Sequence, residues 1–234
     1  MNLCQQLFRS SLGKKYLMAV SGAVLFLFVM GHMLGNLQVF LGPEQINAYG
    51  HFLQTTPEIL WPARVVLLCM VGLHIWAAVT LTLENAAARP IPYAQVAPVV
   101  STYAARTMIW SGLIIAVFIV YHLLHYTVQV PGVNLTGRDF HTLRDTQGRH
   151  DVYRMMILGF SNGWVSGFYI LGVSLLCLHL SHGVGALFQS LGLKNPAWRL
   201  FLDRCGTVAA WVIWAGYLSI PVAIFLGYGK QALQ

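Results

Sequence analysis

The stretch YLMAVSGAVLFLFVMGHMLGNLQVFL, residues 16–41, decides the fold of this chain. It contains no Asp, Glu, Lys or Arg, and it exceeds the length of about 20 apolar residues that a helix needs to cross a bilayer. A secretory signal sequence has a shorter apolar core, of about 7–15 residues. We therefore predict a retained membrane-spanning helix that carries one histidine, His32, inside it.

Four further apolar stretches are long enough to cross a bilayer, at about 61–83, 107–130, 158–191 and 207–226. The chain is 57% hydrophobic and only 9% charged, whereas soluble domains carry about 25% charged residues. We predict an all-α integral membrane protein, a single transmembrane domain over residues 1–234 that forms a five-helix bundle in contact with lipid. No repeat of 20–50 residues is present, and no basic cluster interleaved with aromatics indicates nucleic-acid binding.

The charges predict an orientation for this bundle. Arg9, Lys14 and Lys15 precede the first span, while Glu44 and Glu58 occupy the connection that follows it. Cytoplasmic connections carry an excess of Lys and Arg. We expect the N-terminus on the cytoplasmic side and, after five crossings, the C-terminus outside.

Four histidines lie in four different spans: His32, His74, His122 and His179. The bilayer core offers no water to an imidazole, so each ring needs a partner there. A helix rises about 1.5 Å per residue, which places His32 and His122 roughly 12–13 Å from the outer ends of their helices. The same rise places His74 and His179 roughly 13–18 Å from the inner ends of theirs. The depths predict an outer pair, His32 with His122, and an inner pair, His74 with His179.

Two imidazoles at one depth suit an iron porphyrin that is ligated on both faces. One nitrogen of each ring binds the metal, and the other N–H needs an acceptor. Because both axial positions are filled, such an iron transfers electrons rather than activating oxygen. Two pairs therefore predict two b hemes and an electron path across the membrane.

A proton or metal-ion transporter lined by histidines is the main alternative from another class. It would place carboxylates inside the membrane as part of a relay. The acidic residues lie instead in predicted loops or at helix ends: Glu44, Glu58, Glu84, Asp139, Asp145, Asp151 and Asp203.

Two of the spans offer a second histidine. His125 follows His122 by three residues and His182 follows His179 by three, and residues three apart share a face of an α-helix. Depth favours His122 over His125 and leaves His179 and His182 open. The histidine that does not bind iron, together with basic residues near the predicted surfaces, is a candidate for secondary contacts with a heme or a quinone: His125, His182, Arg106, Lys194 and Arg64.

Short fragments in a fixed order along the chain resemble one known family, the cytochrome b558 subunit of succinate:quinone oxidoreductase, a five-helix diheme membrane anchor shared with some fumarate reductases. The fragments include Gly31-His32-Met33-Leu34-Gly35-Asn36, Asn47-Ala48-Tyr49, Ala88-Arg89-Pro90, Arg106-Thr107-Met108, Tyr121-His122-Leu123, His179-Leu180-Ser181-His182-Gly183 and Gln189-Ser190-Leu191-Gly192.

The resemblance implies that His32 and His122 bind the heme far from the catalytic subunits, and that His74 and His179 bind the near heme. It selects the first histidine of each doublet, because the family ligand in the fourth helix begins an H-x-x-x-G pattern that His179 and Gly183 match. The membrane glutamate that some relatives place near a quinone has no match here, so the resemblance does not locate the quinone site.

The resemblance also implies partners, a cofactor set and a location. It implies a flavoprotein that acts on succinate and an iron–sulfur subunit, with electrons passing between that subunit and membrane quinone, either menaquinone or ubiquinone. The chain itself would then carry no succinate chemistry and would reside in the bacterial cytoplasmic membrane. Whether the complex oxidises succinate or reduces fumarate, and whether it forms a higher oligomer, stay open. Two alternatives remain besides the transporter: a diheme quinol-oxidising subunit of another respiratory complex, such as nitrate reductase, and a structural anchor without heme.

Overall fold

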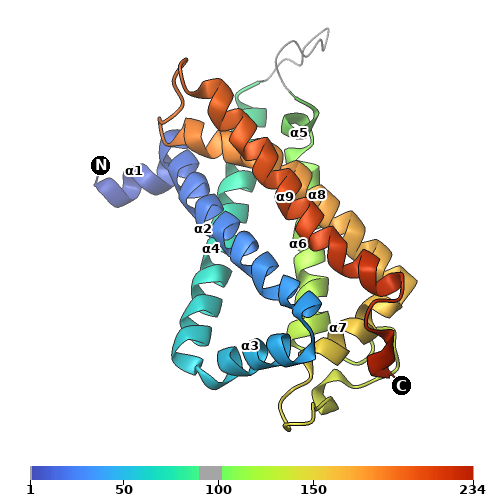
Figure 1. Ribbon diagram of the computed structural model, residues 1–234. Coiled ribbons are helices and arrows are strands. Elements are labelled where there is room, and N and C mark those ends of the chain that lie inside the picture. The colour runs from blue at the N-terminus through green and yellow to red at the C-terminus, as the bar shows by residue number, and fades with distance from the viewer. Residues whose placement is uncertain (1, 90–101, 234) are drawn as a thin grey trace. The chain divides into compact units, whose positions relative to one another are not determined.

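The computed structural model describes residues 2–89 and 102–233, and Pro90 of the fragments above lies outside them. Over the described residues the secondary structure is helical without strands, apart from one isolated bridge between Arg144 and His150. The helices, labelled in Figure 1 where space allows, are α1 (Leu3–Arg9), α2 (Ser11–Leu37), η1 (Gln38–Leu41), α3 (Pro43–Thr55), α4 (Pro57–Ala87), α5 (Tyr103–Arg106), α6 (Met108–His122), η2 (Leu123–Thr127), η3 (Phe140–Thr142), α7 (Val152–Ser161), α8 (Gly163–Ser190), α9 (Arg199–Phe225) and η4 (Lys230–Leu233).

Five helical stretches among the described residues are long and apolar enough to cross a membrane, which confirms the predicted all-α fold with five potential spans. Large apolar side chains lie exposed along these stretches, for example Trp164 with an exposed fraction of 85% and Leu68 with 65%. Such surfaces suit lipid contact, because burying apolar area away from water is favourable. The stretches are Ser11–Leu41, Pro57–Ala87, Met108–Thr127, Gly163–Ser190 and Arg199–Phe225.

The predicted fourth span, 158–191, is two helices. The backbone leaves the helical region at Asn162, where φ is −82° and ψ is 122°. The Asn162 side-chain oxygen then accepts hydrogen bonds from the backbone N–H groups of Trp164 and Val165, at 3.0 and 3.3 Å. Asparagine is a favoured N-cap because it satisfies amide groups that have no partner inside the helix. The break therefore ends α7 at Ser161 and begins α8 at Gly163.

Two other span boundaries also differ from the predicted ones. The third span changes from α-helix to the π-helix η2 at Leu123 and ends at Thr127, three residues before the predicted end. The fifth, α9, begins at Arg199, eight residues before the predicted start. The sequence analysis placed this start after Asp203 and Arg204 because it treated charged residues as loop.

The chain divides into two compact units, each of which contains part of α2, α4, α6, α8 and α9. Unit 1 comprises Met1–Phe28, Arg64–Gly112 and Leu178–Ala210, and unit 2 comprises Val29–Ala63, Leu113–Cys177 and Trp211–Gln234. Each unit is described by itself below.

In unit 1, a charged pair and an aromatic contact join α2 and its neighbour α1 to α4. The Lys14 ammonium donates to the Glu84 carboxylate, and Lys14 has an exposed fraction of only 4%. A buried ammonium is costly unless a carboxylate compensates its charge. The Phe8 and Trp76 rings pack nearby with centroids 5.6 Å apart.

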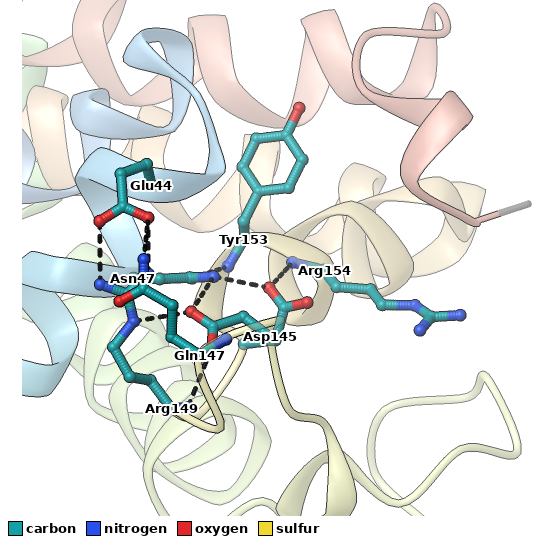
Figure 2. Close-up of polar contacts among 8 residues, drawn as sticks. Glu44, Asn47, Asp145, Gln147, Arg149, Tyr153 and Arg154 are labelled. Carbon is teal, nitrogen blue, oxygen red and sulfur yellow. Dashed lines mark hydrogen bonds and ion pairs between the residues drawn. The ribbon is translucent and has the colours of Figure 1, made fainter.

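In unit 2, α3 packs beside α7, as Figure 1 shows. The sequence places Glu44 in the connection after the first span, and this part of the connection forms the short helix α3. Asn47, with an exposed fraction of 1%, joins the two helices: its amide donates to Asp151 at 3.1 Å, and its oxygen accepts from the backbone N–H of Tyr153 at 2.9 Å. Figure 2 shows this cluster.

A guanidinium completes the same cluster. Arg149 donates to Glu44 at 2.8 Å and to Asp145 at 2.7 Å (Figure 2). The hydrogen bonds from Arg149 lower the pKa of the Glu44 carboxyl. Burial alone would raise the pKa of Asp145, but the hydrogen bonds and positive charge of Arg149 outweigh it and lower that pKa as well. The cluster thus ties the loop before α7 to the first turn of α3.

Candidate functional site

In unit 1, the structure brings His74 of α4 and His179 of α8 together. Their ring centroids are 6.4 Å apart, with an angle of 63° between the ring planes. Both rings are half-buried. A Cβ atom placed on Gly183, one turn after His179, would meet no atom within 4 Å, so space remains beside this ring on its own helix face.

The Nδ1 atoms of this pair have hydrogen-bond partners. Nδ1 of His74 lies 3.2 Å from the Met18 carbonyl oxygen and 3.2 Å from Oγ of Ser21, and Nδ1 of His179 lies 3.1 Å from Oγ of Ser111. A carbonyl oxygen only accepts, so the proton of His74 belongs on Nδ1. The Ser111 hydroxyl lies 3.1 Å from the Met108 carbonyl, and when it donates there its oxygen can accept from Nδ1–H of His179. With Nδ1 protonated in both rings, Nε2 is left unprotonated, the form that binds a metal.

In unit 2, His32 of α2 lies beside His122 of α6. Their centroids are 5.7 Å apart, and the ring planes are nearly perpendicular, at 82°. The Asn36 amide donates to the His32 carbonyl at 2.7 Å. The Tyr217 ring lies 6.3 Å from the His32 ring, and its hydroxyl donates to the Val29 carbonyl at 2.8 Å.

One hydroxyl contacts both histidines of α6 and η2. The Tyr169 oxygen lies 3.3 Å from Nδ1 of His122 and 3.0 Å from Nδ1 of His125. A phenol has one proton, so it donates to one imidazole and accepts from the other. If His122 keeps Nε2 free for a metal, its Nδ1–H donates to Tyr169, and Tyr169 donates to His125.

His125 shares two aromatic neighbours with His122, because both rings lie near Tyr126 and Tyr169. The His125 side chain is fully buried, and its ring stacks on Tyr126 with centroids 3.9 Å apart. Its Nε2 atom has no hydrogen-bond partner among the described residues. The His125 ring also lies 5.7 Å from the Phe140 ring.

The ring separations fit a metal held between two imidazoles. A metal–imidazole nitrogen bond is about 2.0–2.1 Å, the value for zinc. Adding about 1.2 Å from nitrogen to ring centre on each side gives roughly 6.4 Å between centroids. The His74–His179 separation is 6.4 Å, and the His32–His122 separation, 5.7 Å, is shorter than this. The described residues hold no group of three or more His, Cys, Asp or Glu side chains that would suit a bare ion. A heme iron needs only two protein ligands because the porphyrin supplies the others.

The predicted secondary residues occupy varied positions. Lys194 forms an ion pair with Asp203 at 2.5 Å in unit 1. Arg106 is exposed at the end of α5, and His182 is half-buried in α8. Arg64 is half-buried near the start of α4. The role of these residues as heme or quinone contacts stays a prediction.

The residues that the sequence analysis missed are the partners of the histidines, namely Ser21, Ser111 and Tyr169. Their roles depend on contacts between helices far apart in the chain, such as the 68 residues that separate Ser111 from His179. A hydroxyl residue inside an apolar span is a signal, because buried polar groups need partners. That signal alone does not name the partner.

Comparison with known proteins adds no identification, since no family model, curated protein or solved structure matches this chain. The fold and the paired rings define a class: an all-helical protein with five potential membrane spans and two pairs of histidines, each pair within one unit.

Proposed function

We propose that this chain is the diheme cytochrome b membrane-anchor subunit of a succinate:quinone oxidoreductase, passing electrons between an iron–sulfur subunit and membrane quinone. The observation that carries the proposal is the double pairing of imidazoles, His32 with His122 and His74 with His179, at centroid distances of 5.7 and 6.4 Å. All four histidines lie in helices able to span a membrane. The pairs are those that depth along the sequence predicts.

The residues of the chain would bind and orient the two hemes. Each bound heme supplies one-electron chemistry at its iron. The imidazoles would provide the protein nitrogens that bind each iron, and their Nδ1–H groups would donate to acceptors that hold the ring planes. For His74 these acceptors are Met18 and Ser21, and for His179 the acceptor is Ser111. The apolar helices exclude water, which favours electron transfer over reactions with solvent.

The family resemblance, rather than the geometry, supports the succinate side of the proposal. On this basis the chain anchors a flavoprotein and an iron–sulfur subunit to the bacterial cytoplasmic membrane, with its N-terminus inside and its C-terminus outside. Menaquinone or ubiquinone would be the membrane-soluble partner.

A spectroscopic experiment on the complex purified in detergent tests the proposal. We expect a reduced-minus-oxidised spectrum of b heme, two hemes per chain by pyridine hemochrome assay, and reduction of heme by added succinate. A preparation without heme would overturn the cofactor assignment. Two hemes that quinol reduces and succinate does not would point instead to another respiratory complex, and the co-purified subunits, identified by mass spectrometry, would show which one.

A further inference from the structure

The two histidines of the unit 1 pair sit in matching surroundings. Ser21 of α2 contacts Nδ1 of His74, and Ser111 of α6 contacts Nδ1 of His179, at 3.2 and 3.1 Å. Each serine also donates to a carbonyl of its own helix: Ser21 to Leu17 at 2.7 Å, and Ser111 to Met108 at 3.1 Å. Each serine oxygen is thereby oriented to accept from the imidazole of another helix.

A glycine follows each serine and makes room for the same ring. A Cβ atom on Gly22 would lie 3.2 Å from Cε1 of His74, and one on Gly112 would lie 3.4 Å from Cε1 of His179. The first distance is tighter than ordinary carbon contacts, and the second is at their lower edge. The absence of a side chain therefore lets each ring approach the helix that carries its serine.

The match extends along the sequence of the two helices. The pattern Met-x2-Ser-Gly-x5-Phe-x3-His occurs from Met18 to His32 in α2 and again from Met108 to His122 in α6, exactly 90 residues later. Serine and histidine are eleven residues apart in both copies, about three turns of an α-helix, so they share a helix face. Each helix thus contributes a serine to one histidine pair and a histidine to the other.

We propose that Ser21-Gly22 and Ser111-Gly112 are two copies of one positioning element, here named the serine seats, which fix the ligand rings of a single heme and set its reduction potential. The inference rests on the proposed function, because it concerns the heme between His74 and His179. Ser21 and Ser111 act through the histidines and are positioning residues. An acceptor on Nδ1–H raises the basicity of the ligand and so stabilises the oxidised iron.

The two serine seats differ in the number of Nδ1 acceptors that each histidine has, so the two serine substitutions should have unequal effects. His74 has a second Nδ1 acceptor, the Met18 carbonyl at 3.2 Å. His179 has Ser111 as the one Nδ1 acceptor that the described residues provide. Loss of the hydroxyl should therefore matter more at Ser111 than at Ser21.

The experiment is a redox titration of the purified complex, followed by heme absorbance, for Ser111→Ala and Ser21→Ala. We expect Ser111→Ala to raise the midpoint potential of one heme, so that the ratio of reduced to oxidised heme at a fixed potential rises about three- to tenfold, the scale of one hydrogen bond. A tenfold change equals 59 mV for a one-electron couple. Ser21→Ala should give a smaller shift in the same direction and of the same heme.

Three further variants make the outcome decisive. Ser111→Thr keeps the hydroxyl and should keep the wild-type potential. Ser219→Ala is the matched control, because Ser219 also donates to a carbonyl of its own helix, that of Gly216 at 2.7 Å, but lies in unit 2. His32→Ala, which should retain the heme between His74 and His179, assigns the shifted signal.

The proposal fails if both serine variants retain the wild-type potentials, if both hemes shift equally, or if the shifted heme is the one lost in His32→Ala. If Ser111→Ala loses heme, retention of heme by Ser111→Thr supports the hydroxyl's role, and loss in both variants overturns it. Absence of heme from the wild-type complex would instead contradict the proposed function, so the two failures are distinguishable.

Discussion

The two histidine pairs have similar ring separations, but different kinds of residue surround them. Serine hydroxyls and glycines surround His74 and His179 in unit 1, whereas aromatic rings surround His32 and His122 in unit 2. Phe118 stacks on His122 with centroids 6.2 Å apart, and the Tyr169 and Tyr217 rings lie within 6.3 Å of their nearest histidine. The difference shows that a pair of histidine rings can be held at a similar separation by small polar residues or by large aromatic ones. If hemes bind, their environments are unequal.

The largest effect should come from removing a ligand. We expect His32→Ala and His122→Ala to lose the same heme, and His74→Ala and His179→Ala to lose the other, so that each variant retains about half of the wild-type heme. The measurements are pyridine hemochrome content and low-temperature absorbance spectra. His51→Ala, at an exposed position in α3, is the control and should retain both hemes.

If His32→Ala and His74→Ala lost the same heme, the two histidine pairs would not be separate heme sites, and the proposed pairing would be wrong.

A smaller effect on stability and heme potential should follow from Tyr169→Phe, which tests the aromatic surroundings of His32 and His122. This change removes the hydroxyl that can accept from His122 and donate to His125. Tyr169 is buried, with an exposed fraction of 6%. Leaving buried polar atoms without partners costs about 1–3 kcal/mol. We expect a lower melting temperature and a raised midpoint potential for the heme assigned to His32 and His122.

Tyr228→Phe is the matched control, since the Tyr228 hydroxyl donates to Val39 in the same unit and lies outside the pair. An equal change of potential in both variants, or a shift confined to the heme assigned to His74 and His179, would contradict the role of Tyr169.

The smallest effect should come from Arg149→Gln in the loop cluster of unit 2. Arg149 lowers the pKa values of Glu44 and Asp145, so their contribution to stability is present above the unfolded pKa of about 4 and disappears as pH falls through the folded pKa. We expect the variant to melt slightly below the wild type at neutral pH, because the ion pairs with Glu44 and Asp145 are lost. The difference should narrow below about pH 4.

Melting curves from pH 3 to 8, followed by circular dichroism, provide the measurement, and Arg138→Gln in the same loop is the control. A melting difference that is constant over this range would show that Arg149 acts by packing rather than by charge. Heme spectra should not change, because the cluster lies in α3, the loop before α7 and α7 itself, and contains none of the four histidines.

Much of the helical architecture was predictable from sequence, and the particular differences have physical causes. Long apolar runs identify the spans because the bilayer demands them. The break at Asn162 was missed because Ser161-Asn162-Gly163 lies between two apolar runs that together have the length of one long span. The capping contacts of the Asn162 side chain show that the helix restarts. The start of α9 was misplaced because Asp203 and Arg204 lie inside its first turns.

The candidate site was predictable in part. Depth along each helix brings the right histidines together, because helical rise is regular. The serine pattern is also present in the sequence, but its offset of 90 residues is longer than the 20–50 residues typical of structural repeats. Tyr169 could not be assigned as a partner, because its contact to His122 joins residues 47 apart whose relative rotation the sequence does not specify.

The π-helix η2 has a consequence for how this segment tolerates changes in length. Its widened turn accommodates one residue more than an α-helical turn, as the hydrogen bond from Val128 N–H to the Leu123 carbonyl at 2.7 Å shows. Deleting a single residue within η2 would restore a regular α-helical turn and leave the later side chains near their present orientation. The same deletion in α6 would instead rotate every later side chain by about 100°, and Tyr126 would lose its place against Phe160. Insertions and deletions, usually absorbed by loops, would in α6 rearrange an aromatic core.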